Sequence, residues 1–223
     1  IDKHKYLDKK GITVDGKHYN VSGEKSKTDK TVKKSKDIFL ITEKLNEVYK
    51  GSGDCYNVSN DNVFLSKYNE LITAINRHVY LYLLYVGYIS SAYTGINKDN
   101  FNLFFKKESD CPDVGLPIGV DSICLRKYER NGGAYHMPHF DSKGYHLRLV
   151  AVLIYLNDVK LGGETEFPVL NRVVSPQKGR ITIFPSSFTH MYYGRISNSD
   201  KYIVASHVGL YPELKTKEKK ENE

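Results

Sequence analysis

Residues 147–168 read LRLVAVLIYLNDVKLGGETEFP, and this stretch decides the fold class. Its first part, Leu147–Leu156, is a run of mostly apolar and β-branched residues, short enough for one strand and typical of a buried one. An Asn-Asp pair ends the run, and Gly162-Gly163 predicts a tight turn before the next extended segment. We therefore expect a strand, a turn and a second strand here.

Three more β-rich segments flank this stretch. They are Val120–Tyr128, Arg180–Phe184 and Tyr202–Val208, and Gly, Pro, Asn and Asp residues separate them. Several short strands at regular spacing predict a β-sandwich or barrel.

The chain before Gly119 has helical rather than strand-like spacing. Apolar residues recur every three or four positions over 37–50, and further helices are expected over 64–75, 77–93 and 100–107. Helices collected on one face of an antiparallel β fold bury both halves in a single core. The predicted class is α+β, mainly β, with the helices packed on one sheet.

Composition and charge narrow the functional classes. The chain has 223 residues and a net charge of +7, with ordinary contents of hydrophobic and charged residues, which excludes wholesale disorder, a collagen and a fibrous coiled coil. Much of the excess charge lies in lysine-rich ends, so a nucleic-acid partner is disfavoured. The most apolar run, Val79–Tyr93, is shorter than the ~20 residues of a membrane span. No membrane span is therefore expected, and the oligomeric state stays open.

The cysteines indicate the compartment. Cys55, Cys111 and Cys124 are too few and too scattered for a disulfide framework and lack CxxC spacing, so a reducing compartment such as the cytoplasm is expected. The chain begins with Ile1, which leaves a removed leader open. Its richness in Lys, Asn, Ile and Tyr suits an AT-rich microbial or viral genome.

Two histidines and an aspartate form the candidate chemical centre. His139 and Asp141 are two positions apart, so in a strand they point to the same face. His190 follows a later predicted strand and a Pro-Ser-Ser turn. Two His and one carboxylate on one side of a metal form the facial triad of non-haem Fe(II) oxygenases. From the spacing alone, hydrogen-bonded structural histidines remain the alternative.

The flanking sequence carries a specific resemblance. The stretches LRKYERNGGAYHMPHFD, LRLVAVLIYLNDVKLGGETEFP, VVSPQKGRITIFP, SFTHMYYG and KYIVASHV occur in this order. Over residues 125–209 the chain resembles the catalytic domain of the prolyl 4-hydroxylase-like Fe(II)/2-oxoglutarate-dependent dioxygenases. The resemblance implies a double-stranded β-helix, or jelly-roll, core in which His139, Asp141 and His190 bind the iron.

The same resemblance implies a set of 2-oxoglutarate contacts. Lys201 matches the basic residue that holds the far carboxylate of the cofactor, and Arg195 is the alternative for that role. Tyr155 matches a tyrosine whose hydroxyl binds the same carboxylate, and Tyr128 matches one that lies beside the cofactor. Arg148 matches an arginine near the mouth of the site, where it would contact substrate.

The implied activity is hydroxylation of a prolyl residue in a peptide or protein, with decarboxylation of 2-oxoglutarate to succinate. It requires Fe(II), 2-oxoglutarate and O2, and ascorbate is a candidate reductant. Asp141 favours hydroxylation, because family halogenases have a small residue there. The same chemistry on a lysyl residue, a free amino acid or a small metabolite is an alternative, as is a non-oxidising metal-binding or inactive jelly roll. The sequence departs from the family on the last strand, where a Trp is common and His207 stands instead.

This interpretation divides the chain into three parts. They are a polar N-terminal segment, residues 1–36, with a hairpin at Asp15-Gly16; a single catalytic domain, residues 37–212, with helices in 37–110 and the jelly-roll core in 119–210; and a charged disordered tail, residues 213–223.

Overall fold

The computed structural model describes residues 12–14, 17–19, 25–28, 32–42, 54–94, 118–142 and 148–210. Within these ranges the strands are β1 (Ile12–Val14), β2 (Lys17–Tyr19), β3 (Lys25–Thr28), β4 (Lys33–Lys34), β5 (Lys36–Ile41), β6 (Asp54–Asn57), β7 (Ile118–Tyr128), β8 (Ala134–Tyr135), β9 (Arg148–Tyr155), β10 (Thr165–Phe167), β11 (Arg172–Val174), β12 (Ile181–Pro185), β13 (Tyr193–Gly194) and β14 (Lys201–Leu210). The helices are α2 (Asn62–Thr94) and the short 3₁₀ turns η2 (Val58–Asn60), η4 (Pro168–Leu170) and η5 (Phe188–His190).

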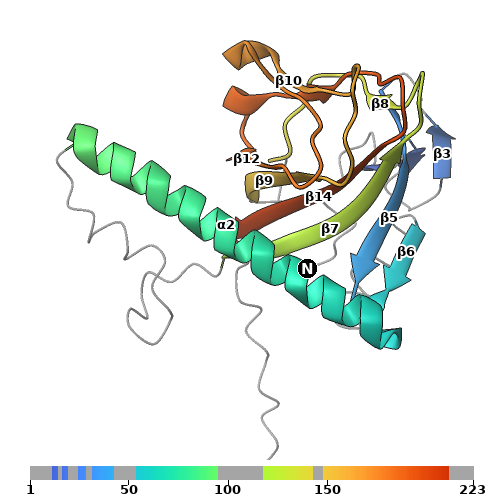
Figure 1. Ribbon diagram of the computed structural model, residues 1–223, viewed down its shortest axis with the longest axis horizontal. Helices are drawn as coiled ribbons and strands as arrows, with labels where there is room; N and C mark the ends of the chain where they lie inside the picture. The colour runs from blue at the N-terminus through green and yellow to red at the C-terminus, as the bar shows by residue number, and fades with distance from the viewer. Residues whose placement is uncertain are drawn as a thin grey trace, which may run out of the picture.

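A six-stranded sheet forms the frame of the molecule, with strand order β12-β9-β14-β7-β5-β6 (Figure 1). Its centre is β14, which pairs antiparallel with β7 on one side and β9 on the other. The four β-rich segments predicted from sequence are β7, β9, β12 and β14, and each lies within two residues of its expected bounds. Their β-branched residues belong in this sheet because both of its faces are covered.

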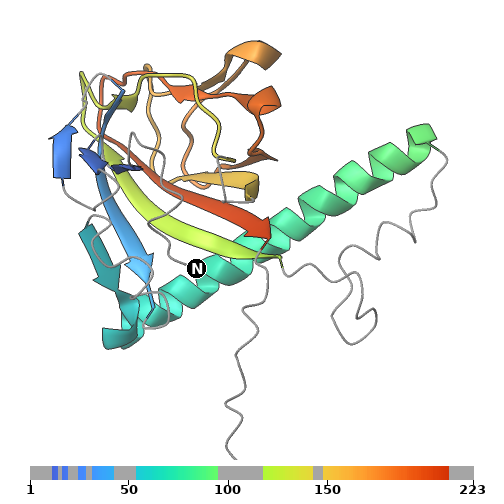
Figure 2. The same ribbon diagram turned by 180° about the vertical axis from the view of Figure 1, so that it is seen from behind.

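Helix α2 covers the outer face of this sheet (Figure 2). Asp61 caps the start of the helix, since its Oδ1 accepts hydrogen bonds from the backbone N–H groups of Val63 at 3.0 Å and Phe64 at 3.1 Å. Ile75 and Val79 of the helix pack into one apolar cluster with strand residues that include Val152, Val204 and Val208. The two helices predicted over 64–75 and 77–93 are therefore one continuous helix, because the residues between them contain no helix breaker.

The prediction of a helix over 37–50 is wrong where the structure describes it. Lys36–Ile41 is strand β5, which pairs antiparallel with β7 and parallel with β6. The backbone groups along the edge of β7 need hydrogen-bond partners, and β5 supplies them, so tertiary pairing outweighs the helical spacing of the apolar residues. Residues 43–50, the predicted helix over 100–107 and the predicted tail over 213–223 lie outside the described residues.

A smaller sheet, β11-β10-β13, closes the interior from the other side. Phe167 of β10 packs in one cluster with Ala151, Tyr155 and Ile203 of the large sheet, so the two sheets face each other across this core. Phe184 lies between them, with its ring 4.8 Å from that of Phe167 between centroids. Two facing sheets with a helix on the outer face confirm the predicted class, mainly β with a jelly-roll core, although α2 is the one α-helix among the described residues.

The N-terminal strands differ in what they contact. β1 and β2 form the predicted hairpin, in which Val14 pairs with Lys17 across Asp15-Gly16. β4 instead pairs with β8, so the chain joins the core from Lys33 onward. Among the described residues no helix combines the length and the apolar character needed to cross a bilayer.

Candidate active site

The interior face of the large sheet is defined by strand alternation. On β14, Ile203 and Ala205 lie in the interior cluster, whereas Val204 and Val208 lie in the cluster under α2. Because side chains alternate along a strand, Lys201 shares the interior face with Ile203 and Ala205, and so does His207. The basic residue predicted for 2-oxoglutarate therefore lines the space between the sheets.

His139 and Asp141 lie on a segment held by backbone hydrogen bonds to the chain around His190. His139 forms an isolated β-bridge with Tyr192, with N–H to C=O distances of 3.0 Å in one direction and 2.9 Å in the other. The N–H of Asp141 donates to the carbonyl of Ser186 at 3.2 Å. His139 Nε2 and Asp141 Oδ1 are 4.0 Å apart, and both side chains are largely buried.

His190 is at the end of η5, two residues before Tyr192. Its Nδ1 lies 2.9 Å from Thr189 Oγ1, which is itself 2.7 Å from Ser187 Oγ. Burial lowers the pKa of His190, so its imidazole is neutral over a wider pH range. The described residues contain no group of three His, Cys, Asp or Glu side chains already gathered at metal-binding spacing. The assignment of His139, Asp141 and His190 as ligands stays a prediction.

Asp141 has two further partners. Tyr192 donates its hydroxyl hydrogen to Asp141 Oδ2 at 2.9 Å, and His207 Nε2 lies 3.5 Å from the same oxygen. Burial would raise the pKa of Asp141, but the hydrogen bond and charge of His207, the charge of His139 and the Tyr192 hydroxyl hold that pKa well below its usual value. The carboxylate is therefore ionised at neutral pH, as a metal ligand must be.

Lys201 is a buried cation without an ion pair among the described residues. It is 2% exposed, its Nζ donates to the carbonyl oxygen of Gly163 at 2.8 Å, and it lies 4.7 Å from the centre of the Tyr128 ring. Gly162 and Gly163 both have positive φ, 75° and 74°, so the predicted turn is formed and aims this carbonyl at the ammonium group. Burial lowers the pKa of Lys201 to about 8; Glu164 raises it and Arg126 lowers it further.

The other residues predicted to bind cofactor or substrate do not all lie in the interior between the sheets. Tyr155 is buried in the interior and donates its hydroxyl hydrogen to Thr165 Oγ1 at 2.7 Å. Arg195 is partly exposed and is bound to Glu166, with Nη2 2.6 Å from Oε2. Arg148 begins β9 and pairs with Gly209 of β14, next to a register shift between Val208 and Gly209. The structure thus gathers Lys201, Tyr128 and Tyr155 between the sheets.

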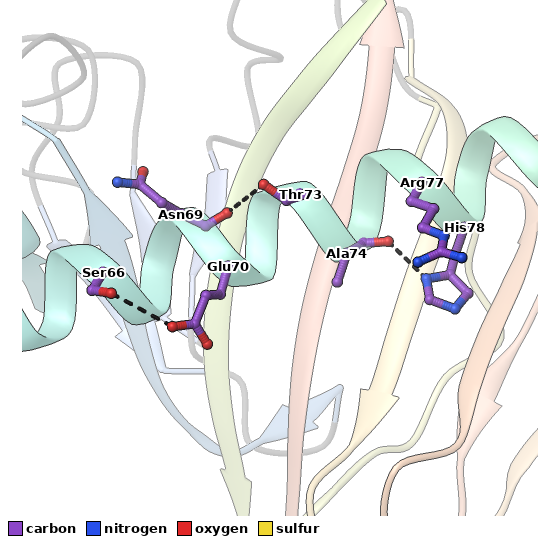
Figure 3. Close-up of a pocket in the computed structure, with 7 residues that line it drawn as sticks. All are labelled: Ser66, Asn69, Glu70, Thr73, Ala74, Arg77 and His78. Carbon is purple, nitrogen blue, oxygen red and sulfur yellow. Dashed lines mark hydrogen bonds between the residues drawn. The ribbon is translucent and has the colours of Figure 1, made fainter.

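A shallow hollow on α2 is the other candidate (Figure 3). All of its lining residues belong to this single helix; they are Ser66, Asn69, Glu70, Thr73, Ala74, Arg77 and His78. Their polar atoms bind within the helix, as Thr73 Oγ1 does to the carbonyl of Asn69 at 2.8 Å. One convex helix face cannot enclose a ligand, so this hollow is not a site.

Comparisons with known proteins concern the segment that contains the interior residues described above. Residues 124–208 match the model of the 2OG-Fe(II) oxygenase superfamily. No curated protein sequence matches the chain. Solved structures are similar over less than half of this chain. A viral collagen prolyl hydroxylase from Paramecium Bursaria Chlorella virus-1 is 20% identical over 43% of this chain and 61% of its own, with a TM-score of 0.37.

Two further solved structures show the same level of likeness. A prolyl hydroxylase from Trichoplax adhaerens, in complex with a hypoxia inducible factor peptide fragment, is 23% identical over 41% of this chain and 44% of its own, with a TM-score of 0.37. A prolyl 4-hydroxylase from Phytophthora capsici is 25% identical over 40% of this chain and 32% of its own, with a TM-score of 0.36.

The alignments cover less than two thirds of the length of each of these proteins. The family model matches the very segment in which the sequence resemblance, the two facing sheets and the buried lysine coincide. Residues 124–208 of this chain are similar to the 2OG-Fe(II) oxygenase superfamily, as the sequence resemblance predicts.

Proposed function

We propose that the protein is an Fe(II)- and 2-oxoglutarate-dependent dioxygenase that hydroxylates a prolyl residue in a peptide or protein and releases succinate and CO2. The observation that carries this proposal is Lys201, a buried ammonium group with a carbonyl and an aromatic ring for partners and no carboxylate within ion-pair distance among the described residues. A buried cation without a counter-ion is costly, and an anionic ligand relieves that cost.

The charge around the interior also fits an acidic cofactor. Lys33 and Arg126 are buried around a single carboxylate, that of Asp37, with Arg126 Nε 3.0 Å from Asp37 Oδ2. Lys201 lies apart from this closed group, makes no ion pair among the described residues and has Glu164 and Arg126 in its electrostatic surroundings, so it is the cation available to a dicarboxylate such as 2-oxoglutarate. Lys201 is the group best placed to bind its far carboxylate, and Tyr155 lies on the same interior face.

The donor set fits a first-row metal ion. Two facial donors, each ~2.1 Å from a metal and at about a right angle, are ~3 Å apart. His139 Nε2 and Asp141 Oδ1 are separated by 4.0 Å, so the two side chains would approach each other by about 1 Å on metal binding. His139, Asp141 and His190 would hold Fe(II), which in this family supplies the oxidising chemistry with 2-oxoglutarate and O2. Ascorbate as a reductant is part of the same proposal.

The chain's own residues would orient the cofactor and keep the site dry. Lys201 neutralises one carboxylate, and the Tyr128 ring stays against the ammonium group. The rings of Phe167, Phe184 and Tyr192 fill the space between the sheets, so little bulk water competes for the reacting groups. Cys124 forms no disulfide among the described residues, which is compatible with the reducing compartment that we infer.

The test is an anaerobic titration of the iron-free protein with Fe(II) and then 2-oxoglutarate. We expect the weak visible charge-transfer band of an iron-chelated 2-oxo acid in the wild type. His139→Ala should lose this band, and Lys201→Ala should need much more 2-oxoglutarate to reach it. A wild-type protein that binds Fe(II) and gives no band would overturn the cofactor assignment.

The substrate is tested separately by succinate formation in air. Peptides that contain proline should raise succinate release above the level without peptide, and the same peptides with alanine in place of proline should not. Stimulation by lysine-containing peptides, free amino acids or small metabolites, without any by proline peptides, would keep the oxygenase and reject the prolyl substrate.

A further inference from the structure

The two oxygens of the Asp141 carboxylate have different surroundings. Oδ2 accepts the hydroxyl hydrogen of Tyr192 at 2.9 Å and faces His207 Nε2 at 3.5 Å. Oδ1 lies on the other side, 4.0 Å from His139 Nε2. One oxygen is thus engaged by residues outside the predicted ligand set, and the other faces a predicted ligand.

Tyr192 is itself fixed in place. It is 7% exposed, and its ring packs on Phe184 with centroids 4.8 Å apart and on the His139 imidazole with centroids 4.3 Å apart. Its backbone exchanges two hydrogen bonds with that of His139. A side chain held at both its backbone and its ring presents its hydroxyl group in one direction, which is what a positioning residue requires.

His207 approaches the carboxylate from a different element. It lies on the interior face of β14, where it pairs with Ala151 of β9, and its side chain is 12% exposed. Tyr192 follows η5 and His207 belongs to the central strand, so the contacts to Oδ2 come from two separate parts of the fold. Such contacts keep a carboxylate from rotating about its Cβ–Cγ bond.

We propose that Tyr192 and His207 are positioning residues that hold Asp141 Oδ2, so that the carboxylate would present Oδ1 to Fe(II). The inference rests on the proposed function, because it requires Asp141 to be a metal ligand. A carboxylate that binds through one oxygen leaves more coordination positions open for 2-oxoglutarate and O2 than one that binds through both. Removing the Tyr192 hydroxyl frees Oδ2 to turn towards the metal.

The experiment measures metal affinity and the spectrum of the bound metal rather than catalytic turnover. Mn(II) affinity is determined by calorimetry without 2-oxoglutarate for the wild type, Tyr192→Phe, His207→Phe and His139→Ala, and the visible spectrum of the Co(II)-loaded proteins is recorded. Tyr135→Phe is the matched control, because the Tyr135 ring also lies against His139, with centroids 3.6 Å apart, but makes no hydrogen bond to Asp141.

We expect Tyr192→Phe to weaken Mn(II) binding about tenfold, as outer-shell substitutions do at metal sites, and to change the Co(II) band. His207→Phe should weaken it by a smaller factor, because its contact is longer. Tyr135→Phe should match the wild type in both measurements. The melting temperatures of the metal-free proteins show whether each variant is folded.

The outcomes separate the two proposals. If wild type and His139→Ala bind Mn(II) equally, or neither binds it, the proposed metal site fails. If His139→Ala loses the metal while Tyr192→Phe and His207→Phe keep the wild-type affinity and Co(II) band, the positioning role is overturned and the metal site stands. If His207→Phe loses the metal as completely as His139→Ala, His207 is a ligand and not a positioning residue.

Discussion

Two buried lysines on the inner side of the molecule have opposite surroundings. Lys33 is bound to Asp37, which also pairs with Arg126, so this end of the interior is a closed group of charges. Lys201 has a backbone carbonyl and the Tyr128 ring instead. Burial lowers the pKa of both lysines. One arrangement is a closed ion-pair group within the protein, whereas the other has no ion pair among the described residues. The first stabilises the fold, and the second is the group that we propose binds the cofactor.

The ion-pair group of Lys33, Asp37 and Arg126 also connects the N-terminal strands to the segment that matches the family model. Asp37 is on β5 and Arg126 on β7, where the two residues are directly opposite in the antiparallel ladder. Burial would raise the pKa of Asp37, but Arg126 and Lys33 hold it below its ordinary value. Residues that precede the matched segment therefore complete its charge balance.

The largest expected effect comes from breaking the closed group. Asp37→Asn leaves two buried cations without their carboxylate, and we expect a loss of ~3–5 kcal/mol in the free energy of unfolding. Urea unfolding of the metal-free protein measures it. The control is Glu129→Gln, which removes the exposed pair with Lys36 and should leave the free energy of unfolding nearly unchanged. Equal, small effects of both substitutions would contradict the distinction between the two lysines.

Removing the second lysine should act in the opposite direction on stability. Lys201→Met replaces a buried cation by an apolar chain, so the metal-free protein should be ~1–3 kcal/mol more stable at pH 7. The folded-state pKa of Lys201, about 8, lies below its unfolded value of 10.5. The penalty is therefore full below pH 8 and disappears as the pH rises towards 10.5. The same variant should lose ~2–5 kcal/mol of 2-oxoglutarate binding free energy.

Two titrations test whether Lys201→Met raises stability while it weakens cofactor binding. They are urea unfolding at pH 7 and at pH 9.5, and anaerobic 2-oxoglutarate binding to the Fe(II) protein. A variant that is less stable than the wild type at pH 7 would mean that Lys201, like Lys33, already has a complete set of partners. Unchanged 2-oxoglutarate affinity would remove its role in the site.

A change of pH should alter 2-oxoglutarate affinity less than the removal of Lys201 does. Binding the far carboxylate requires protonated Lys201, whose pKa in the free protein is about 8. The 2-oxoglutarate affinity should therefore fall about fourfold between pH 7 and pH 8.5. Lys201→Arg keeps its charge throughout and should show no such fall, even if its affinity is lower overall. The charge-transfer band at the two pH values measures both, and parallel curves for the two proteins would rule out Lys201 titration.

The sequence predicted the parts of the fold that local pattern determines. The strands β7, β9, β12 and β14 have continuous apolar runs ended by turn residues, and Gly162-Gly163 forms its turn at positive φ. Strand β5 was missed because its apolar residues also suit a helix, and only its pairing with β7 makes it a strand. The prediction of two helices failed because nothing in the sequence ends the first.

The candidate site also contains residues that sequence motifs predict and residues that only the tertiary structure brings together. Lys201, His139 and Asp141 stand in recognisable motifs, so sequence alone named them. Tyr192 was missed because it meets Asp141 only after η5 has turned the chain, although it stands two residues after His190. His207 was noticed as a departure from the family, but its approach to Asp141 depends on the register between β14 and β9.

The smallest expected effect separates the two cations that sequence left as rivals for the cofactor carboxylate. Arg195 is bound to Glu166, which Tyr193 also contacts, and its side chain is 46% exposed. A cation that is solvated and already paired gains little from a second carboxylate. Arg195→Ala should therefore leave 2-oxoglutarate affinity within about twofold of the wild type. A loss as large as that of Lys201→Met would instead assign the carboxylate to Arg195 and return Lys201 to a structural role.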